Sequence, residues 1–215
     1  MHIQPAFRAT PSPAHAGLPE AAVLSSMQPA AITLFDADAV IYAQGDKAGP
    51  LYFVEFGTIR ISRMSADGRR QITAFHTAGD VFGFEAGSEH ESYAESVDGA
   101  GIRVLRSTAG QQPAADLLRL ALASLARTQG HLMLLGRRSA NERMAAFLLD
   151  LCERQAEERH VHFAMQRNDI ADYLGMTFET VSRVLRHLKD ERIIRMASVS
   201  QIEILDRAAL EEMCD

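Results

Sequence analysis

The sequence predicts an α+β protein with an N-terminal β-roll, one long helix and a C-terminal winged helix-turn-helix unit. Three observations support this fold class. Short strand-like runs separated by glycines fill residues 32–105, apolar residues recur at helical spacing after Pro113, and two amphipathic runs meet at Gly175. The 215 residues, 47% of them hydrophobic, suffice for one or two domains with apolar cores and exclude a disordered chain.

The expected domain boundaries follow changes in composition and period. Residues 1–28 contain several prolines and little periodicity, which predicts a flexible tail. We assign the β-roll to residues 29–110, the long helix to 111–136, the winged helix-turn-helix to 137–208 and a C-terminal tail to 209–215.

The β-roll is predicted from short β-rich runs, which are residues 39–42, 51–54, 58–62 and 71–75. Turns that contain glycine separate these runs, at Gly45, Gly49, Gly57, Gly68 and Gly79. Evenly spaced short strands with such turns indicate a compact barrel or roll.

The long helix carries a row of leucines at spacings of three, four and seven residues, namely Leu118, Leu122, Leu125, Leu132 and Leu135. A two-stranded coiled coil fits this row, and a helix packed on its own β-roll fits the spacing equally well. Ser139 and Glu142 form a capping box that starts the next helix, so we expect a hinge at residues 136–138.

The helix-turn-helix is predicted between Arg167 and Leu188. Gly175 can adopt the left-handed backbone that ends a helix, and Thr177 is a good N-cap for the next one. The inward positions of the two helices are apolar, namely Ile170, Ala171, Leu174, Val181, Val184, Leu185 and Leu188. Alternating runs at 193–196 and 201–204 predict a hairpin, the wing, beside the second helix.

The outward face of the second helix is polar. In a helix-turn-helix the second helix lies in the DNA major groove with its N-terminal residues at the base edges. Arginine can donate to guanine O6 and N7, and glutamate can accept from cytosine N4. The residues predicted to read bases are Glu179, Ser182 and Arg183, and those predicted to contact phosphates are Arg167, Thr177, Thr180 and Arg186. The competing interpretation is a solvated helix face with ordinary charges.

The net charge of −6 argues weakly against nucleic-acid binding, because phosphate contacts need Lys or Arg. Basic residues nevertheless cluster around the motif, at Arg167, Arg183, Arg186, Lys189, Arg192 and Arg195. We therefore expect a local positive stripe on an acidic body.

Three segments resemble the cyclic-AMP receptor/fumarate-nitrate-reductase regulator superfamily. Glu-Thr-Val-Ser-Arg at 179–183 is similar to its second-helix signature, 79–85 to its β-roll turn, and 141–148 to the helix before its DNA-binding unit. The resemblance covers roughly residues 32–210. It implies a cyclic-nucleotide-binding-like β-roll, dimerisation through the leucine row, and double-stranded DNA and RNA polymerase as partners.

The resemblance does not extend to a ligand, and we expect no cofactor and no metal. Glu91 stands where the cyclic-AMP branch has a phosphate-binding Arg, and Glu89 and Glu95 flank it. Residues 1–151 contain no cysteine for an iron-sulfur cluster. Histidines that could bind haem are more often ordinary surface or core residues, and Cys152 with His160 and His162 lacks the spacing of a zinc site.

This pattern resembles the FixK-like subgroup, regulators of microaerobic, nitrogen-fixation or denitrification genes. It implies a cytoplasmic, homodimeric activator, neither an enzyme nor a membrane protein, that binds an inverted repeat of the TTGA...TCAA kind. The alternative is a ligand-gated sensor of the same superfamily that responds to haem, nitric oxide or a small metabolite.

Overall fold

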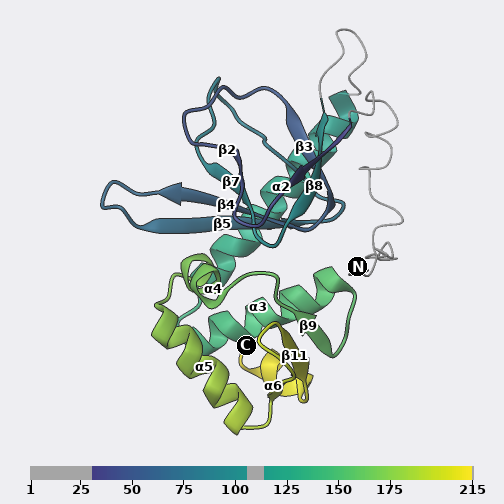
Figure 1. Cartoon of the computed structure of the whole chain (residues 1–215). Coiled ribbons are helices and arrows are strands. Elements are labelled where there is room, and N and C mark those ends of the chain that lie inside the picture. The colour runs from purple at the N-terminus through teal and green to yellow at the C-terminus, as the bar shows by residue number, and fades with distance from the viewer. Residues whose placement is uncertain (1–30, 106–113, 215) are drawn as a thin grey trace, which may run out of the picture.

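A long helix, α2 (Ala114–Leu135), joins a β-rich N-terminal part to a mostly helical C-terminal part in the computed structural model (Figure 1). The structure describes residues 31–105 and 114–214. The predicted tail at residues 1–28 lies outside the described residues. No helix within the described ranges is long and apolar enough to cross a bilayer.

Two four-stranded antiparallel sheets form the N-terminal roll, in the orders β1-β8-β3-β6 and β2-β7-β4-β5. The strands are β1 (Ile32–Phe35), β2 (Val40–Tyr42), β3 (Leu51–Phe56), β4 (Thr58–Met64), β5 (Arg70–Thr77), β6 (Val81–Phe82), β7 (Tyr93–Ser96) and β8 (Ala100–Leu105). The predicted β-roll is confirmed, and the four predicted runs correspond to β2, β3, β4 and β5. Its core contains Val54, Ile59, Phe82, Ala94 and Ile102, all nearly inaccessible to solvent.

The passage from one sheet to the other depends on Gly57, between β3 and β4. Its φ is 87°, and a Cβ built there would lie 2.2 Å from the backbone oxygen of Gly99. A side chain at this position is excluded by both the backbone conformation and the close neighbour.

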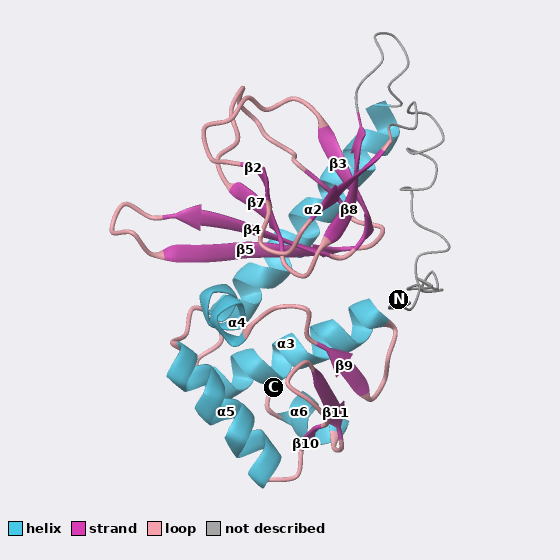
Figure 2. Ribbon diagram, viewed as in Figure 1, coloured by secondary structure: helices cyan, strands magenta, loops and turns pink. Residues whose placement is uncertain are grey.

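The C-terminal part is a winged helix (Figure 2). Its elements are α3 (Ala140–Gln155), β9 (His160–His162), α4 (Arg167–Leu174), α5 (Phe178–Asp190), β10 (Ile194–Met196), β11 (Gln201–Ile204) and α6 (Arg207–Glu212). The strands form an antiparallel sheet in the order β10-β11-β9, so the predicted wing hairpin is present with a third strand on its edge. Leu210 of α6 is fully buried, so the segment that composition placed in a C-terminal tail is part of the domain.

Candidate nucleic-acid interface

The turn between α4 and α5 is specified locally. Gly175 has φ 59° and ψ 45°, the left-handed conformation that ends α4. Thr177 caps α5, because its hydroxyl accepts a hydrogen bond from the backbone N–H of Thr180 at 3.2 Å. The inward residues Val181 and Leu188 are completely buried in the C-terminal core. These contacts fix which side of α5 faces solvent.

Glu179, Arg183 and Arg186 are exposed on the outer side of α5, which lies along the outside of the C-terminal part (Figure 2). Arg183 Nη2 donates to Thr180 Oγ1 at 3.3 Å, and no ion pair holds the guanidinium within residues 31–105 and 114–214. The backbone amide of Glu179 and the hydroxyl of Thr177 lower the pKa of the Glu179 carboxyl, which keeps it ionised and able to accept hydrogen bonds. This end of α5 therefore presents an unpaired donor group beside an acceptor group.

Ser182 does not share this orientation. The residue is half-buried, and its Oγ is shielded from solvent without a hydrogen-bond partner among the described residues. It follows the fully buried Val181 and so lies at the border of the inward face. Of the three residues predicted to read bases, the structure brings Glu179 and Arg183 together on the outside and leaves the Ser182 hydroxyl inside.

The residues predicted to contact phosphates lie at the start of α4, at the start of α5 and in the second half of α5. Thr177 and Arg186 are exposed, whereas Arg167 at the start of α4 and Thr180 are half-buried. A shallow cavity of about 320 Å³ between the N-terminus of α3 and α5 is lined by Ser139, Asn141, Thr180, Arg183 and His187 among others. The free N–H groups at a helix N-terminus carry partial positive charge, so this hollow suits an anion.

One outward residue, Phe178, was not among those predicted. This first residue of α5 is 45% exposed and lies next to Glu179. The hydrophobic periodicity of α5 gave no signal for this exposure, because the spacing of Phe178 from Val181 and Leu185 would place it on the inward row. Its exposed ring adds an apolar group to the outer face.

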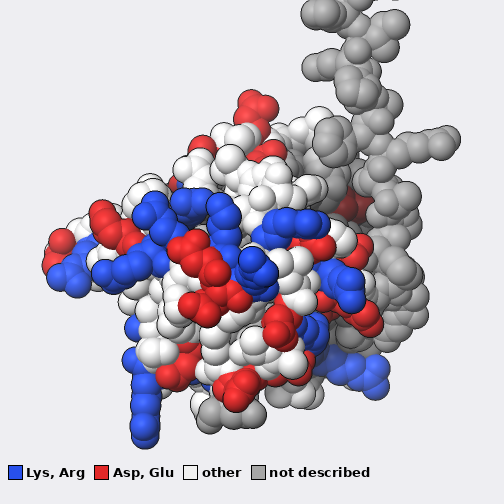
Figure 3. All heavy atoms as spheres, turned by 90° about the horizontal axis from the view of Figure 1, so that it is seen from below, with Lys and Arg blue, Asp and Glu red and all other residues white. Residues whose placement is uncertain are grey.

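Basic side chains gather in a band on the surface seen from below, which extends to the projecting end on the left and has acidic side chains next to it (Figure 3). Arg186, Lys189 and Arg192 are exposed. Arg195 instead pairs with Glu203 of the neighbouring strand. The local positive stripe therefore rests on α5 and the residues just after it more than on the wing.

The outer side of α2 carries a row of exposed apolar residues, which are Leu118, Leu122, Leu125, Leu132 and Met133, each at least half exposed. Leu120 and Leu134 are buried on the opposite side of the helix. Leu135 differs from the prediction, because it is half-buried and packs against the C-terminal core. At the end of α2 the apolar row turns towards α3, and Met133 takes the exposed position.

A β-roll connected by a long helix to a winged helix-turn-helix with an open polar face defines a class of DNA-binding transcriptional regulators. A profile for the Crp-like helix-turn-helix domain matches residues 142–213, and one for the cyclic nucleotide-binding domain matches residues 32–120. The chain belongs to the CRP/FNR family of transcriptional regulators, and it is FixK-like. The members of this family are regulators and not enzymes.

Individual relatives support this assignment. The chain is 44% identical over 187 residues to the nitrogen fixation regulation protein FixK of Rhizobium meliloti (strain 1021), covering 87% of this chain and 89% of the relative. It is 33% identical to the fumarate and nitrate reduction regulatory protein of Vibrio cholerae, covering 80% and 74%. The solved structure of FixK2 from Bradyrhizobium japonicum superposes with a TM-score of 0.79 at 37% identity, covering 86% of this chain and 98% of that one.

Aromatic side chains occupy the core of the β-roll, in a domain family that takes its description from a cyclic nucleotide. Aromatic rings fill its core: Tyr42 stacks on His90 at 3.6 Å between centroids, and Tyr52 lies 5.2 Å from Phe82. His90 is 2% exposed and Phe82 is also 2% exposed. These rings belong to the packed core of the roll, so a purine there would have to displace them.

Two of the three acidic residues predicted to repel a phosphate form ion pairs with arginines. Glu91 pairs with Arg63 at 2.8 Å and Glu95 pairs with Arg60 at 3.0 Å. Part of their negative charge is therefore compensated, whereas Glu89 forms no ion pair with any residue in 31–105 or 114–214, and the expected repulsion of a phosphate stays a prediction. Within the described ranges no group of three His, Cys, Asp or Glu residues could hold a metal ion.

Proposed function

We propose that this regulator binds an inverted repeat of the TTGA...TCAA kind as a homodimer and activates microaerobic, nitrogen-fixation or denitrification genes. The observation that carries the proposal is the pair of Glu179 and Arg183, one turn apart and exposed on α5, where no carboxylate from residues 31–105 or 114–214 pairs with the arginine. The name of the Rhizobium meliloti relative, a nitrogen fixation regulation protein, supports the choice of genes.

Base recognition follows from the chemistry of three side chains. Arg183 donates to O6 and N7 of guanine, and Glu179 accepts from N4 of a cytosine on the facing strand. The exposed ring of Phe178 suits the methyl group of a neighbouring thymine. Ser182 contributes only after its hydroxyl rotates outward from its buried position.

The phosphates are contacted by Arg186, Arg167, Thr177 and Thr180. The largest part of this contact falls to Arg186, because its side chain is exposed.

The exposed row on α2 supports the homodimer, because a second copy would cover the apolar side chains in a coiled coil. Leu125→Asp should yield monomers that bind the operator at least about 100-fold more weakly, since a half-site alone remains and a charge enters the interface. Sedimentation and DNA binding at micromolar protein measure both effects. Leu205→Asp is the matched control, because Leu205 is 48% exposed, close to the 52% of Leu125, and lies away from α2. A Leu125→Asp protein that sediments as a dimer contradicts the role of the row.

Selection of bound DNA from a random pool tests the operator directly. Purified protein without added nucleotide should enrich inverted TTGA half-sites about one helical turn apart. RNA polymerase added to a promoter that carries the selected site should then produce more transcript than without the regulator. Recovery of no common sequence would reject the proposed operator.

A ligand-gated regulator is the second candidate, supported by a cavity of about 540 Å³ between β5, α2 and α3. Its lining includes His76, Asp80, Arg127, Arg154 and Tyr173. Visible absorbance of the purified protein, or a tenfold gain in operator affinity on adding a metabolite or nitric oxide, would favour this candidate over the first.

A further inference from the structure

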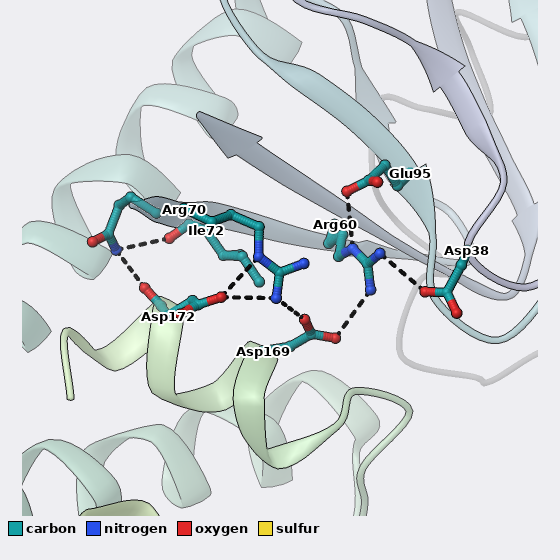
Figure 4. A network of polar contacts seen from close by, with 8 residues as sticks. Asp38, Arg60, Arg70, Ile72, Glu95, Asp169 and Asp172 are labelled. Atoms are coloured by element: carbon teal, nitrogen blue, oxygen red, sulfur yellow. Dashed lines mark hydrogen bonds and ion pairs between the residues drawn. The ribbon is translucent and has the colours of Figure 1, made fainter. Parts of the chain in front are cut away.

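A network of ion pairs centred on the buried Asp169 joins the β-roll to α4, the first helix of the helix-turn-helix (Figure 4). Asp169 on α4 is 3% exposed. Its two carboxylate oxygens accept from Arg60 Nη1 of β4 at 3.2 Å and from Arg70 Nη2 of β5 at 2.5 Å. The same carboxylate therefore bridges two strands of the roll to one helix of the other domain.

The network continues on both sides of Asp169. Arg70 Nε donates to Asp172 Oδ2 at 2.8 Å, one turn further along α4. Arg60 also pairs with Glu95 and Asp38 of the roll, each at 3.0 Å. Two arginines thus serve four carboxylates, of which two belong to the roll and two to α4.

These contacts fix the position of α4 on the roll. Arg60 is 7% exposed and Asp169 is 3% exposed, so a slide or rotation of α4 would leave charges unpaired in a region of low dielectric constant. Gln71 adds a hydrogen bond from Nε2 to the Asp172 backbone oxygen at 2.6 Å. The Gln71 amide, Arg60 and Arg70 together define how far α4 lies from the roll and how it is rotated about its axis.

The position of α4 in turn sets that of α5. Ile170 and Leu174 of α4 are completely buried in the same core as Val181 and Leu188 of α5. The short turn around Gly175 connects the two helices. The helix-turn-helix therefore moves as one body, and its orientation relative to the roll and to α2 is the orientation of α4.

We propose that Arg60 and Arg70 are positioning residues for DNA recognition, which hold α5 at the angle that its operator requires. The proposal rests on the proposed recognition of an operator by α5 in a two-fold dimer, where both recognition helices must meet their half-sites together. The β-roll supplies this orientation from its own side chains, in place of a ligand bound in its core.

Arg70→Gln tests the proposal because it changes the roll and leaves the sequence of the DNA-binding unit intact. Arg63→Gln is the matched control: it removes the same charge from the neighbouring strand, where Arg63 pairs only with the exposed Glu91. The operator is the sequence that the wild-type protein selects from a random pool. We expect Arg70→Gln to bind it about tenfold more weakly, with unchanged affinity for random DNA. Arg63→Gln should stay within about twofold of wild type on both, and Arg70→Lys should recover most of the operator affinity because it keeps a charge near Asp169.

Asp172→Asn provides the same test from the other partner, and thermal unfolding confirms that each variant is folded. An equal loss of affinity for operator and random DNA would show that Arg70 merely attracts DNA. This result would overturn the proposal. Operator affinity that stays at the wild-type level in folded Arg70→Gln and Asp172→Asn also overturns it. A wild-type protein that selects no sequence instead overturns the proposed function.

Discussion

The arginines of α5 and those of the domain interface have the same side chain in opposite surroundings. Arg183 and Arg186 are exposed and form no ion pair with any residue in 31–105 or 114–214. Arg60, Arg70 and Arg154 are each paired with at least one aspartate. A paired guanidinium has little left to offer a phosphate or a base. The difference separates charges that hold the two domains together from charges available to DNA.

The cost of removing a charge should follow the same division. Loss of a partner inside the interface leaves a buried ion uncompensated, which lowers the free energy of unfolding. Loss of an exposed arginine from α5 leaves folding unchanged and removes a contact that exists only with DNA. Three substitutions test this division. The substitution in the interface is measured by unfolding, and the two substitutions on α5 are measured by DNA binding.

The largest effect is expected for Asp80, which precedes β6 and holds one arginine from each of two helices. Its carboxylate lies 3.4 Å from Arg127 of α2 and 3.3 Å from Arg154 of α3, and its own exposure is 7%. Asp80→Asn should lower the free energy of unfolding by about 3 kcal/mol, at the lower end for buried pairs because both arginines are partly exposed. Urea unfolding at pH 7 measures it. Asp67→Asn, which removes an exposed ion pair with Arg69, should leave the urea unfolding curve close to that of wild type.

The pH dependence of the free energy of unfolding provides a second test of the role of Asp80. Burial by itself would raise the pKa of Asp80, but His76, Arg154 and Arg127 outweigh burial and hold the pKa well below its usual value. A carboxyl with a lowered pKa in the folded state stabilises fully above its unfolded pKa, about 4, and loses this contribution as the pH falls further. The gap between wild type and Asp80→Asn should therefore narrow as the pH falls below about 4, whereas near neutral pH it also reflects the titration of His76, whose pKa is lowered by burial and raised by Asp80. A gap that widens in acid contradicts the assignment.

Arg183→Ala should have the next largest effect, on DNA alone. Loss of a bidentate contact to guanine costs roughly 1–3 kcal/mol and relaxes the preference at that G·C pair. Binding to operators with each base at this position measures the preference, and the unfolding curve should match that of wild type. A variant that keeps full preference for the G·C pair would show that another residue reads it.

Arg186→Ala should have the smallest effect of the three. A phosphate contact contributes to all sequences alike, so affinity should fall a few-fold for operator and random DNA, and the slope of log affinity against log salt should flatten by about one for each arginine lost. A change in which sequence is preferred would move Arg186 to the base-reading set.

The same division explains what could be predicted from the sequence. The inward face of α5, its Thr177 cap and the Gly175 stop depend on neighbours within a few residues, so their pattern is written in one short segment. The pairing of Arg60 with Asp169 joins residues 109 positions apart, and neither residue carries a local sign of the other. The buried Ser182 hydroxyl lies at the border of a helix face, where spacing alone cannot decide between inside and outside. Leu135 was assigned to the exposed row because it continues the spacing of the other leucines. At this end of α2, however, that spacing leads to a side chain that packs against the C-terminal core.

Arg60 and Asp169 are separated by 109 residues in the sequence, so the two sides of the interface are synthesised at different times. Both sheets of the roll are complete at Leu105, before any residue of α4 has been made. At about 5–20 residues per second, roughly five to twenty seconds separate the synthesis of the two partners. Glu95 and Asp38, the other carboxylate partners of Arg60, both precede α4 in the sequence. All the partners that Arg60 has within the roll are therefore synthesised before the helix that carries Asp169.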